Sequence, residues 1–176
     1  FRWRLWRICY HNKAVLFFKV RKYLFKSFLL FFIHSISFAD CDTSQVELWG
    51  ECYSLSATNI SLPNRSLTGP IPPEIGLFEN LINLKLKYNN LTGPIPPEIG
   101  NLINLETLEL QFNNLSGPIP DGLWGLTNLR QLRLQKNQFT GNISPQIGDL
   151  TALTHLYLYG NQLTGPIPSE IGNLSN

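Results

Sequence analysis

The sequence predicts an α/β solenoid of stacked short units rather than a globular domain built around one pocket. Two sets of residues recur at the same 24-residue step and carry this prediction: the glycines Gly69, Gly93, Gly117, Gly141 and Gly165, and the asparagines Asn89, Asn113, Asn137 and Asn161. A fixed period of this length is typical of proteins in which each repeat contacts only its neighbours.

The first 39 residues are interpreted as sequence that precedes the folded protein. Residues 1–18 are basic and aromatic without a clear period, and we expect them to be unstructured upstream sequence, with an amphipathic membrane-surface segment as the alternative. Residues 19–39 combine a basic start, an apolar run over 28–38 and the small residues Ser37 and Ala39. This order predicts a signal peptide cleaved after Ala39, with an uncleaved signal anchor as the alternative.

The remaining chain is acidic and is expected to be exported. From Asp40 onward there are six basic and twelve acidic residues, a net charge of −6, which argues against a nucleic-acid-binding surface. The predicted location is therefore secreted or at the cell surface, and a membrane is expected to be reached only through the leader or a C-terminal segment beyond Asn176.

Residues 40–56 are expected to form an N-terminal cap. Export leaves Cys41 and Cys52 as an even pair in an oxidising compartment, which favours a disulfide that closes a short loop over the end of the stack. Zinc binding is the weaker alternative, because no other cysteine and no nearby histidine completes a set of four ligands.

Five units of 24 residues are predicted to fill residues 57–176, at 57–80, 81–104, 105–128, 129–152 and 153–176. Each begins with an alternating segment such as Leu84-x-Leu86, the pattern of a short strand with one buried face. Because each strand returns one period later in the same direction, the strands are expected to pair in parallel.

The rest of each unit predicts a bend, a tight turn and a short helical turn. Asn89 and its equivalents can satisfy backbone groups that leave the ladder, and Arg65 takes their place in the first unit, facing the cap. Gly93 allows the turn, and the following prolines suit the start of a helical turn. Trp124, in place of a glycine, and Ser144, in place of a proline, are expected to be tolerated at the periphery.

The repeat LxxLxxLxLxxNxLxGxIPxxIGxL resembles the plant-type leucine-rich repeat of receptor-like kinase and receptor-like protein ectodomains and of polygalacturonase-inhibiting proteins. Its regular IPPEIGNL segments are also similar to microbial repeat proteins, which leaves the kingdom open. The resemblance implies a right-handed superhelix with a concave parallel β-sheet, short 3-10 or α turns on the convex side, and often a second sheet. It also implies a protein, peptide or glycan ligand on the concave face or its flank.

The strand positions that vary between units are the candidates for ligand contact. They combine basic, long polar and aromatic side chains, which protein and glycan contacts use. We name the following twelve the variable face: Lys85, Lys87, Tyr88, Glu109, Gln111, Phe112, Arg133, Gln135, Lys136, His155, Tyr157 and Tyr159.

Catalysis is not predicted, and no cofactor or metal is expected. His155 has no nucleophile or carboxylate partner at the required spacing, and Glu74 and Glu98 are repeated positions on a solvated face. The remaining hypotheses are a recognition module at the N-terminal end of a longer protein such as a receptor ectodomain, a secreted inhibitor of a cell-wall-degrading enzyme, or a structural or adhesive surface protein. Six sequons are possible N-glycosylation sites: Asn59, Asn64, Asn90, Asn114, Asn142 and Asn173.

Overall fold

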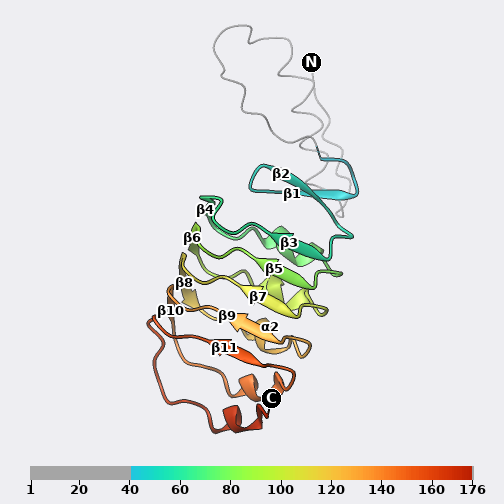
Figure 1. Cartoon of the computed structure of the whole chain (residues 1–176). Coiled ribbons are helices and arrows are strands. Elements are labelled where there is room, and N and C mark those ends of the chain that lie inside the picture. The colour runs from blue at the N-terminus through green and yellow to red at the C-terminus, as the bar shows by residue number, and fades with distance from the viewer. Residues whose placement is uncertain (1–40, 176) are drawn as a thin grey trace, which may run out of the picture. The chain divides into compact units, whose positions relative to one another are not determined.

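The alternating apolar segments of the five units, Leu-x-Leu in four of them and Ile60-x-Leu62 in the first, form one parallel sheet, in the order β11-β9-β7-β5-β3. The computed structural model describes residues 41–175, and the predicted upstream and leader segments lie outside them. Each strand pairs with its equivalent one unit away, as Leu84 does with Leu108 (Figure 1). The concave sheet consists of β3 (Asn59–Ser61), β5 (Asn83–Lys85), β7 (Thr107–Glu109), β9 (Gln131–Arg133) and β11 (His155–Tyr157).

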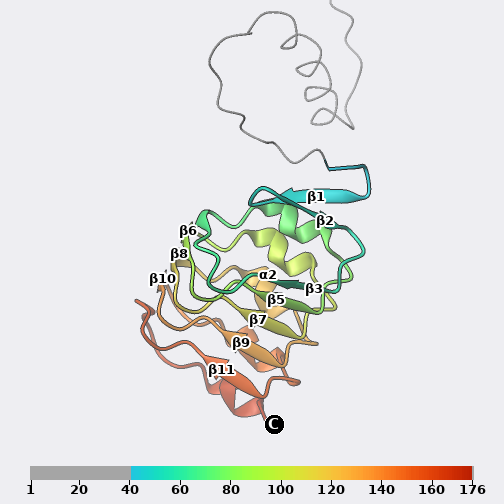
Figure 2. The ribbon, with the colours of Figure 1, turned by 45° about the horizontal axis from the view of Figure 1, so that its top comes forward.

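A second parallel sheet lies beside the first and follows each asparagine bend. Its order is β10-β8-β6-β4, and its strands are seen along one flank of the stack in Figure 2. The glycine at or near the end of each strand has a positive φ, +75° at Gly93, which a residue with a Cβ adopts only with strain. The strands are β4 (Thr68–Gly69), β6 (Asn90–Gly93), β8 (Asn114–Pro118) and β10 (Gln138–Thr140).

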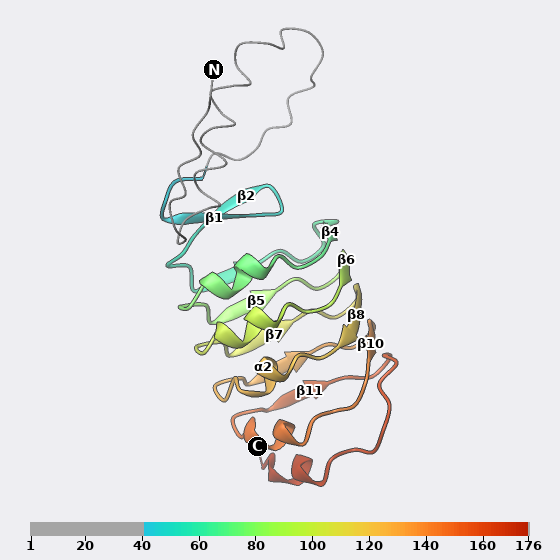
Figure 3. The same ribbon diagram turned by 180° about the vertical axis from the view of Figure 1, so that it is seen from behind.

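Short helical turns form the convex side, seen from behind in Figure 3. Four are 3-10 helices, and the one in the third unit is an α-helix. Proline stands at the N-cap of η2, η3, α2 and η5, and Ser144 stands at that of η4, where its side chain accepts a hydrogen bond from Gln146 N. The elements are η2 (Pro73–Leu77), η3 (Pro97–Asn101), α2 (Asp121–Trp124), η4 (Pro145–Asp149) and η5 (Ser169–Asn173).

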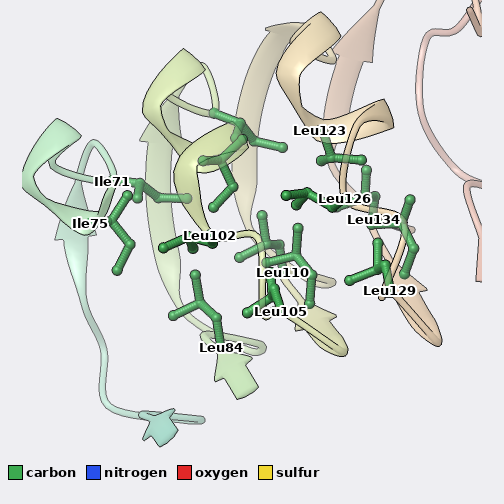
Figure 4. Close-up of a cluster of buried hydrophobic side chains, with 14 of the residues drawn as sticks. Ile71, Ile75, Leu84, Leu102, Leu105, Leu110, Leu123, Leu126, Leu129 and Leu134 are labelled. Atoms are coloured by element: carbon green, nitrogen blue, oxygen red, sulfur yellow. The ribbon is translucent and has the colours of Figure 1, made fainter. Parts of the chain in front are cut away.

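A continuous row of aliphatic side chains fills the space between the sheets and the helical turns. Leu84 from a strand, Leu102 from the end of a helical turn and Leu105 from the next bend are fully buried, and Figure 4 shows leucines of neighbouring units lying against one another. Burying one leucine side chain stabilises a fold by about 1.5–3 kcal/mol. The repeated leucines therefore supply the main interaction between adjacent units.

Trp124 is not peripheral, and this corrects the expectation from the sequence. Its side chain is only 1% exposed, the largest of the fully buried side chains in residues 41–175. At the equivalent position Gly76, an added Cβ would lie 2.6 Å from Glu98 Cβ, so adjacent helical turns normally touch there. In the third unit the indole is packed into the convex layer instead, where the helical turn is α2 rather than a 3-10 helix.

An antiparallel hairpin of β1 (Gln45–Leu48) and β2 (Glu51–Ser54) covers the first unit. Cys41 and Cys52 form the predicted disulfide, with Cα atoms 5.5 Å apart. Leu48 belongs to the hydrophobic core, so the hairpin closes the end of the leucine row. No helix within residues 41–175 is long and apolar enough to span a bilayer.

Candidate functional site: the variable face

The variable face lies on the strands of the concave sheet and on the residues that follow them. Within β5, β7 and β9, Leu84, Leu108 and Leu132 point into the core. The residues on either side of each leucine therefore point to the opposite face, because side chains alternate along a strand. Residues one period apart are direct neighbours, and Lys85, Glu109 and Arg133 form one such row.

The centre of the variable face is more buried than a set of solvated strand positions. Strand β7 is buried throughout, and beside it the side chains of Gln111 and Gln135 are only 3% and 7% exposed. Glu109 is equally enclosed and pairs with Lys87, whose Nζ lies 2.9 Å from Glu109 Oε2. A carboxylate removed from water needs such a partner, because burying an isolated charge is costly.

Four buried polar atoms on this face make no hydrogen bond within residues 41–175. One of them, Glu109 Oε2, has Lys87 as its ion-pair partner, and the other three have neither kind of partner: Gln111 Oε1, Gln135 Oε1 and Arg133 Nε. Leaving a buried polar group unpaired costs about 1–3 kcal/mol. Gln111 and Gln135 occupy equivalent positions in adjacent units, so the two residues are neighbours on the face. The face thus has unused hydrogen-bonding capacity.

Aromatic rings lie at both ends of the variable face. Tyr88 and Phe112 are stacked, with ring centroids 4.6 Å apart and an interplanar angle of 14°. At the other end, the Arg133 guanidinium lies 5.3 Å from the centroid of Tyr157, and Lys136 Nζ lies 5.8 Å from that of Tyr159. All four rings remain partly exposed, so they can contact a ligand.

The stacked rings are held on strained backbone. Tyr88 and Phe112 both have φ of 57°, the left-handed region that large side chains disfavour by roughly 1–2 kcal/mol per residue. Stacking returns about 0.5–1.5 kcal/mol. The equivalent residues Asn64, Lys136 and Gly160 have the same left-handed backbone, so this conformation belongs to the repeat, and the sequence places two aromatic rings on it.

His155 lies apart from the buried centre of the face. It is exposed on β11, the last strand, and its Nδ1 atom lies 2.9 Å from Thr154 Oγ1. Its neighbour on β9 is Gln131. Within residues 41–175, no cluster of three or more His, Cys, Asp or Glu side chains could hold a metal ion.

The predicted asparagine ladder lies behind this face, and its members are hydrogen-bonded on both ends of the amide. Asn113 Nδ2 donates to Leu86 O at 3.0 Å and to Leu110 O at 2.9 Å, and its Oδ1 accepts from Leu91 N at 3.0 Å. Asn89, Asn137 and Asn161 make the equivalent contacts. Each amide therefore joins its own unit to the preceding one.

Arg65 replaces the ladder asparagine in the first unit and reaches the cap. Its Nη2 lies 3.0 Å from Glu51 Oε1, and Tyr53 Oη donates to Glu51 Oε2 at 2.8 Å. The hydrogen bond from Tyr53, aided by Arg65, lowers the pKa of the Glu51 carboxyl. Burial together with this carboxylate raises the pKa of Tyr53.

The sequons are distributed over both sheets and the last helical turn. Asn59 begins β3, Asn90 and Asn114 begin β6 and β8, and Asn173 ends η5. Asn64 has φ of 56°, and Asn142 Oδ1 accepts a hydrogen bond from Thr164 Oγ1 at 3.1 Å. All six asparagines are exposed.

Comparisons with known proteins agree with this geometry. Family models match, one described as Leucine Rich repeats (2 copies) over residues 127–176 and one described as Leucine Rich Repeat over 80–102 and 104–126. The ectodomain of the receptor kinase SOBIR1 from Arabidopsis thaliana is 35% identical, with a TM-score of 0.66, over 72% of this chain and 69% of that one. No curated protein matches.

Two further solved structures extend the likeness. The plant peptide hormone receptor RGFR1 in complex with RGF2 is 41% identical, with a TM-score of 0.65, over 66% of this chain and 19% of that one. A plant ice-binding protein is 34% identical, with a TM-score of 0.61, over 65% of this chain and 37% of that one. The chain thus spans less than a fifth of that receptor structure. It belongs to the leucine-rich repeat family, in the plant-type form found in receptor-kinase ectodomains.

Proposed function

We propose that this chain is an extracellular recognition module that binds an acidic, extended peptide segment across its variable face. The observation that carries the proposal is that two residues at equivalent positions of adjacent units each have a buried amide oxygen without a partner, Gln111 Oε1 and Gln135 Oε1, on a face enriched in positive charge. Solved relatives include a receptor in complex with a peptide hormone. The proposal concerns recognition and assigns no catalytic step to the chain.

Charge favours an acidic ligand. The variable face has four basic residues, Lys85, Lys87, Arg133 and Lys136, and one acidic residue, Glu109, whereas the chain from Asp40 onward has a net charge of −6. Glu109 is already paired with Lys87. The other three cations have no carboxylate partner within residues 41–175 and can attract carboxylates of a ligand, which raises the association rate more than the affinity.

Hydrogen bonding favours an extended peptide. A peptide lying along the solenoid axis crosses one strand every 4.7–4.9 Å or so, and its backbone N–H groups can pair with the two amide oxygens once the Gln111 and Gln135 side chains turn out of their buried positions. Such donors would remove the free-energy penalty of the two unpaired oxygens, so this hydrogen bonding stabilises the complex and not the free protein. Tyr157, Tyr159 and the Tyr88–Phe112 pair would then enclose the ligand at its two ends, as aromatic residues commonly do at binding hot spots.

The proposed location is outside the cell. The disulfide between Cys41 and Cys52 favours an oxidising compartment, as does the leader predicted from the sequence. A secreted inhibitor would also bind a protein through this face. It would differ in taking a folded enzyme, rather than a short peptide, as its ligand.

The test is selection of a phage-displayed random peptide library on the immobilised protein, followed by measurement of Kd for the enriched peptides. We expect acidic sequences, and a Kd that rises on the order of tenfold in Arg133→Gln. Arg130→Gln is the matched control, since Arg130 pairs with Glu106 away from the variable face. Failure to enrich any peptide, or equal effects of the two substitutions, would contradict the proposal.

A second candidate is suggested by the second sheet. Each unit has one hydroxyl residue at the same position along this sheet: Thr68, Thr92, Ser116, Thr140 and Thr164. Three of them, Thr68, Thr92 and Thr164, are exposed. A regular row of hydroxyls can order water, and a plant ice-binding protein is among the similar structures. Thermal hysteresis measured on the purified protein decides this. A value that drops in Thr92→Leu supports ice binding, and no hysteresis excludes it.

A further inference from the structure

One column of residues bends away from the concave sheet with the same left-handed backbone in every unit. Asn64, Tyr88, Phe112 and Lys136 have φ between 56° and 58°, and Gly160 has 68°. Each of the first four donates its backbone N–H to the unit that follows, as Asn64 does to Lys87 O and Tyr88 does to Gln111 O. The position of Asn64 relative to Tyr88 is therefore the same as the position of Tyr88 relative to Phe112.

Side chains in this column lie along it, over the next unit. Phe112 stacks on one face of Tyr88. At the end of the column, Lys136 extends over Gly160, which has no side chain. A Cβ added to Gly160 would lie 2.9 Å from Lys136 Cδ, and Lys136 Nζ lies over the ring of Tyr159. A long group attached at Asn64 would by the same geometry lie over the other face of Tyr88.

Asn64 is built to carry such a group. It begins the sequon Asn64-Arg65-Ser66, it is exposed, and its side chain makes no hydrogen bond to any residue in 41–175. Asparagine also accepts the left-handed backbone better than most residues do. The exposed amide of Asn64 therefore lies next to the ring of Tyr88. One face of that ring is covered by Phe112, and no ring of this column covers the other face.

We propose that Asn64 carries an N-linked glycan whose first sugar packs against Tyr88 and extends the Tyr88–Phe112 stack. This inference rests on the extracellular location proposed above. The sugar comes from a polyprenyl-diphosphate-linked oligosaccharide. Asn64 Nδ2 forms a bond to C1 of the N-acetylglucosamine that is attached to the diphosphate, and it loses a proton. The C1–O bond to the diphosphate breaks, and the lipid diphosphate leaves.

The ring face gives this sugar a defined position. An aromatic ring is electronegative over its face, and the C–H groups on the apolar side of a pyranose are weakly positive, so the two surfaces attract. The glycan would cover the N-terminal end of the stack. The peptide site would then lie on the other side of the Tyr88–Phe112 pair, over β7, β9 and β11, with that pair still at its end.

Occupancy is the first measurement. The full chain is expressed in insect cells behind a secretion signal of the host, and the fraction of each sequon that carries sugar is determined by site-resolved mass spectrometry. Asn173, at the end of η5, is the control sequon. We expect Asn64 to be occupied, and an unmodified Asn64 overturns the proposal whatever the other sequons carry.

Packing is the second measurement, in a double-mutant cycle on protein trimmed enzymatically to the first sugar. The sugar at Asn64 should raise the melting temperature relative to Asn64→Gln by roughly 2 to 4 °C, and this increment should vanish in the Tyr88→Asn background. Tyr88→Asn keeps a residue that accepts the left-handed backbone, so the variant folds. An equal increment in both backgrounds overturns the packing. Neither measurement needs a peptide ligand, so failure of the peptide-binding proposal is seen separately.

Discussion

Two rows of buried amides run side by side through this protein, and they differ in whether their hydrogen bonds are made. Asn113, in the ladder, uses Nδ2 twice and Oδ1 once, all with backbone atoms. Gln111, two residues earlier on the concave side, is more deeply buried than Asn113, yet its Oε1 is unpaired within residues 41–175. A fold does not gain stability from such an oxygen.

The difference separates scaffold from recognition without reference to any ligand. A buried polar group that satisfies backbone atoms is required by the fold, because those atoms would otherwise be unpaired. A buried polar group that is itself unpaired lowers stability, and it is best explained by a partner that arrives later. By this criterion the asparagine row belongs to the scaffold, and Gln111 and Gln135 belong to the binding site that we propose.

The largest expected effect is on the scaffold row. Asn113→Leu leaves Leu91 N without its partner, and it removes one of the two amide donors from Leu86 O and from Leu110 O, which keep Asn89 and Asn137. We expect the free energy of unfolding, measured by urea denaturation, to fall by about 2 kcal/mol or more, from about 1–3 kcal/mol for the unpaired N–H group and about 0.5–1.5 kcal/mol for each hydrogen bond lost at a carbonyl. A loss below about 0.5 kcal/mol would mean that water reaches these groups.

At the N-terminal end, the cap that covers the first unit is stabilised by a disulfide as well as by hydrogen bonds and burial. Replacing both Cys41 and Cys52 by serine should lower stability by about 2 to 3 kcal/mol, through the freedom regained by the unfolded chain. Thermal melts with and without a thiol reductant measure this, and the double variant should be insensitive to reductant. Equal melting temperatures for the oxidised and reduced wild-type protein would contradict a stabilising cap.

A smaller effect is expected where Arg65 stands in place of a ladder asparagine. The pKa of Glu51 is lowered in the folded protein, first by the hydrogen bond from Tyr53. Its contribution is therefore fully present above the unfolded pKa of about 4.3 and is lost as the pH falls through the lower folded value.

Glu51→Gln measures this contribution of an exposed group. The melting temperatures of the variant and the wild-type protein should differ at pH 7 and converge as the pH is lowered toward 3. A difference that stays constant over this range would show that the carboxylate charge does not contribute.

The sequence predicted the repeating scaffold well because one period fixes both burial and backbone geometry. The Leu-x-Leu strands, the bonding of Asn113 to two units and the contact of Arg65 with the cap all depend on one unit and its immediate neighbour. Residues that depart from the repeat pattern were harder to predict from the sequence. Trp124 was expected at the periphery, since a consensus glycine position does not reveal how much room the adjacent helical turns leave for an indole.

The burial of Gln111 and Gln135 also could not be predicted, although both residues were selected as variable. Their exposure depends on the length of the side chains in the neighbouring rows and on the ion pair between Lys87 and Glu109. The left-handed backbone of Tyr88 and Phe112 was likewise missed. Its signal was present in the column itself, because the equivalent positions hold Asn64 and Gly160, the residue types that favour that conformation.

The smallest expected effect provides the most direct test of the separation between scaffold and recognition. Gln111→Leu removes an unpaired amide and keeps a similar volume, so its free energy of unfolding in urea, without ligand, should equal that of the wild-type protein or exceed it by up to about 1 kcal/mol. Asn113→Leu, measured beside it, should lose about 2 kcal/mol or more. A loss in Gln111→Leu as large as that in Asn113→Leu would contradict the account, because Gln111 would then be part of the scaffold.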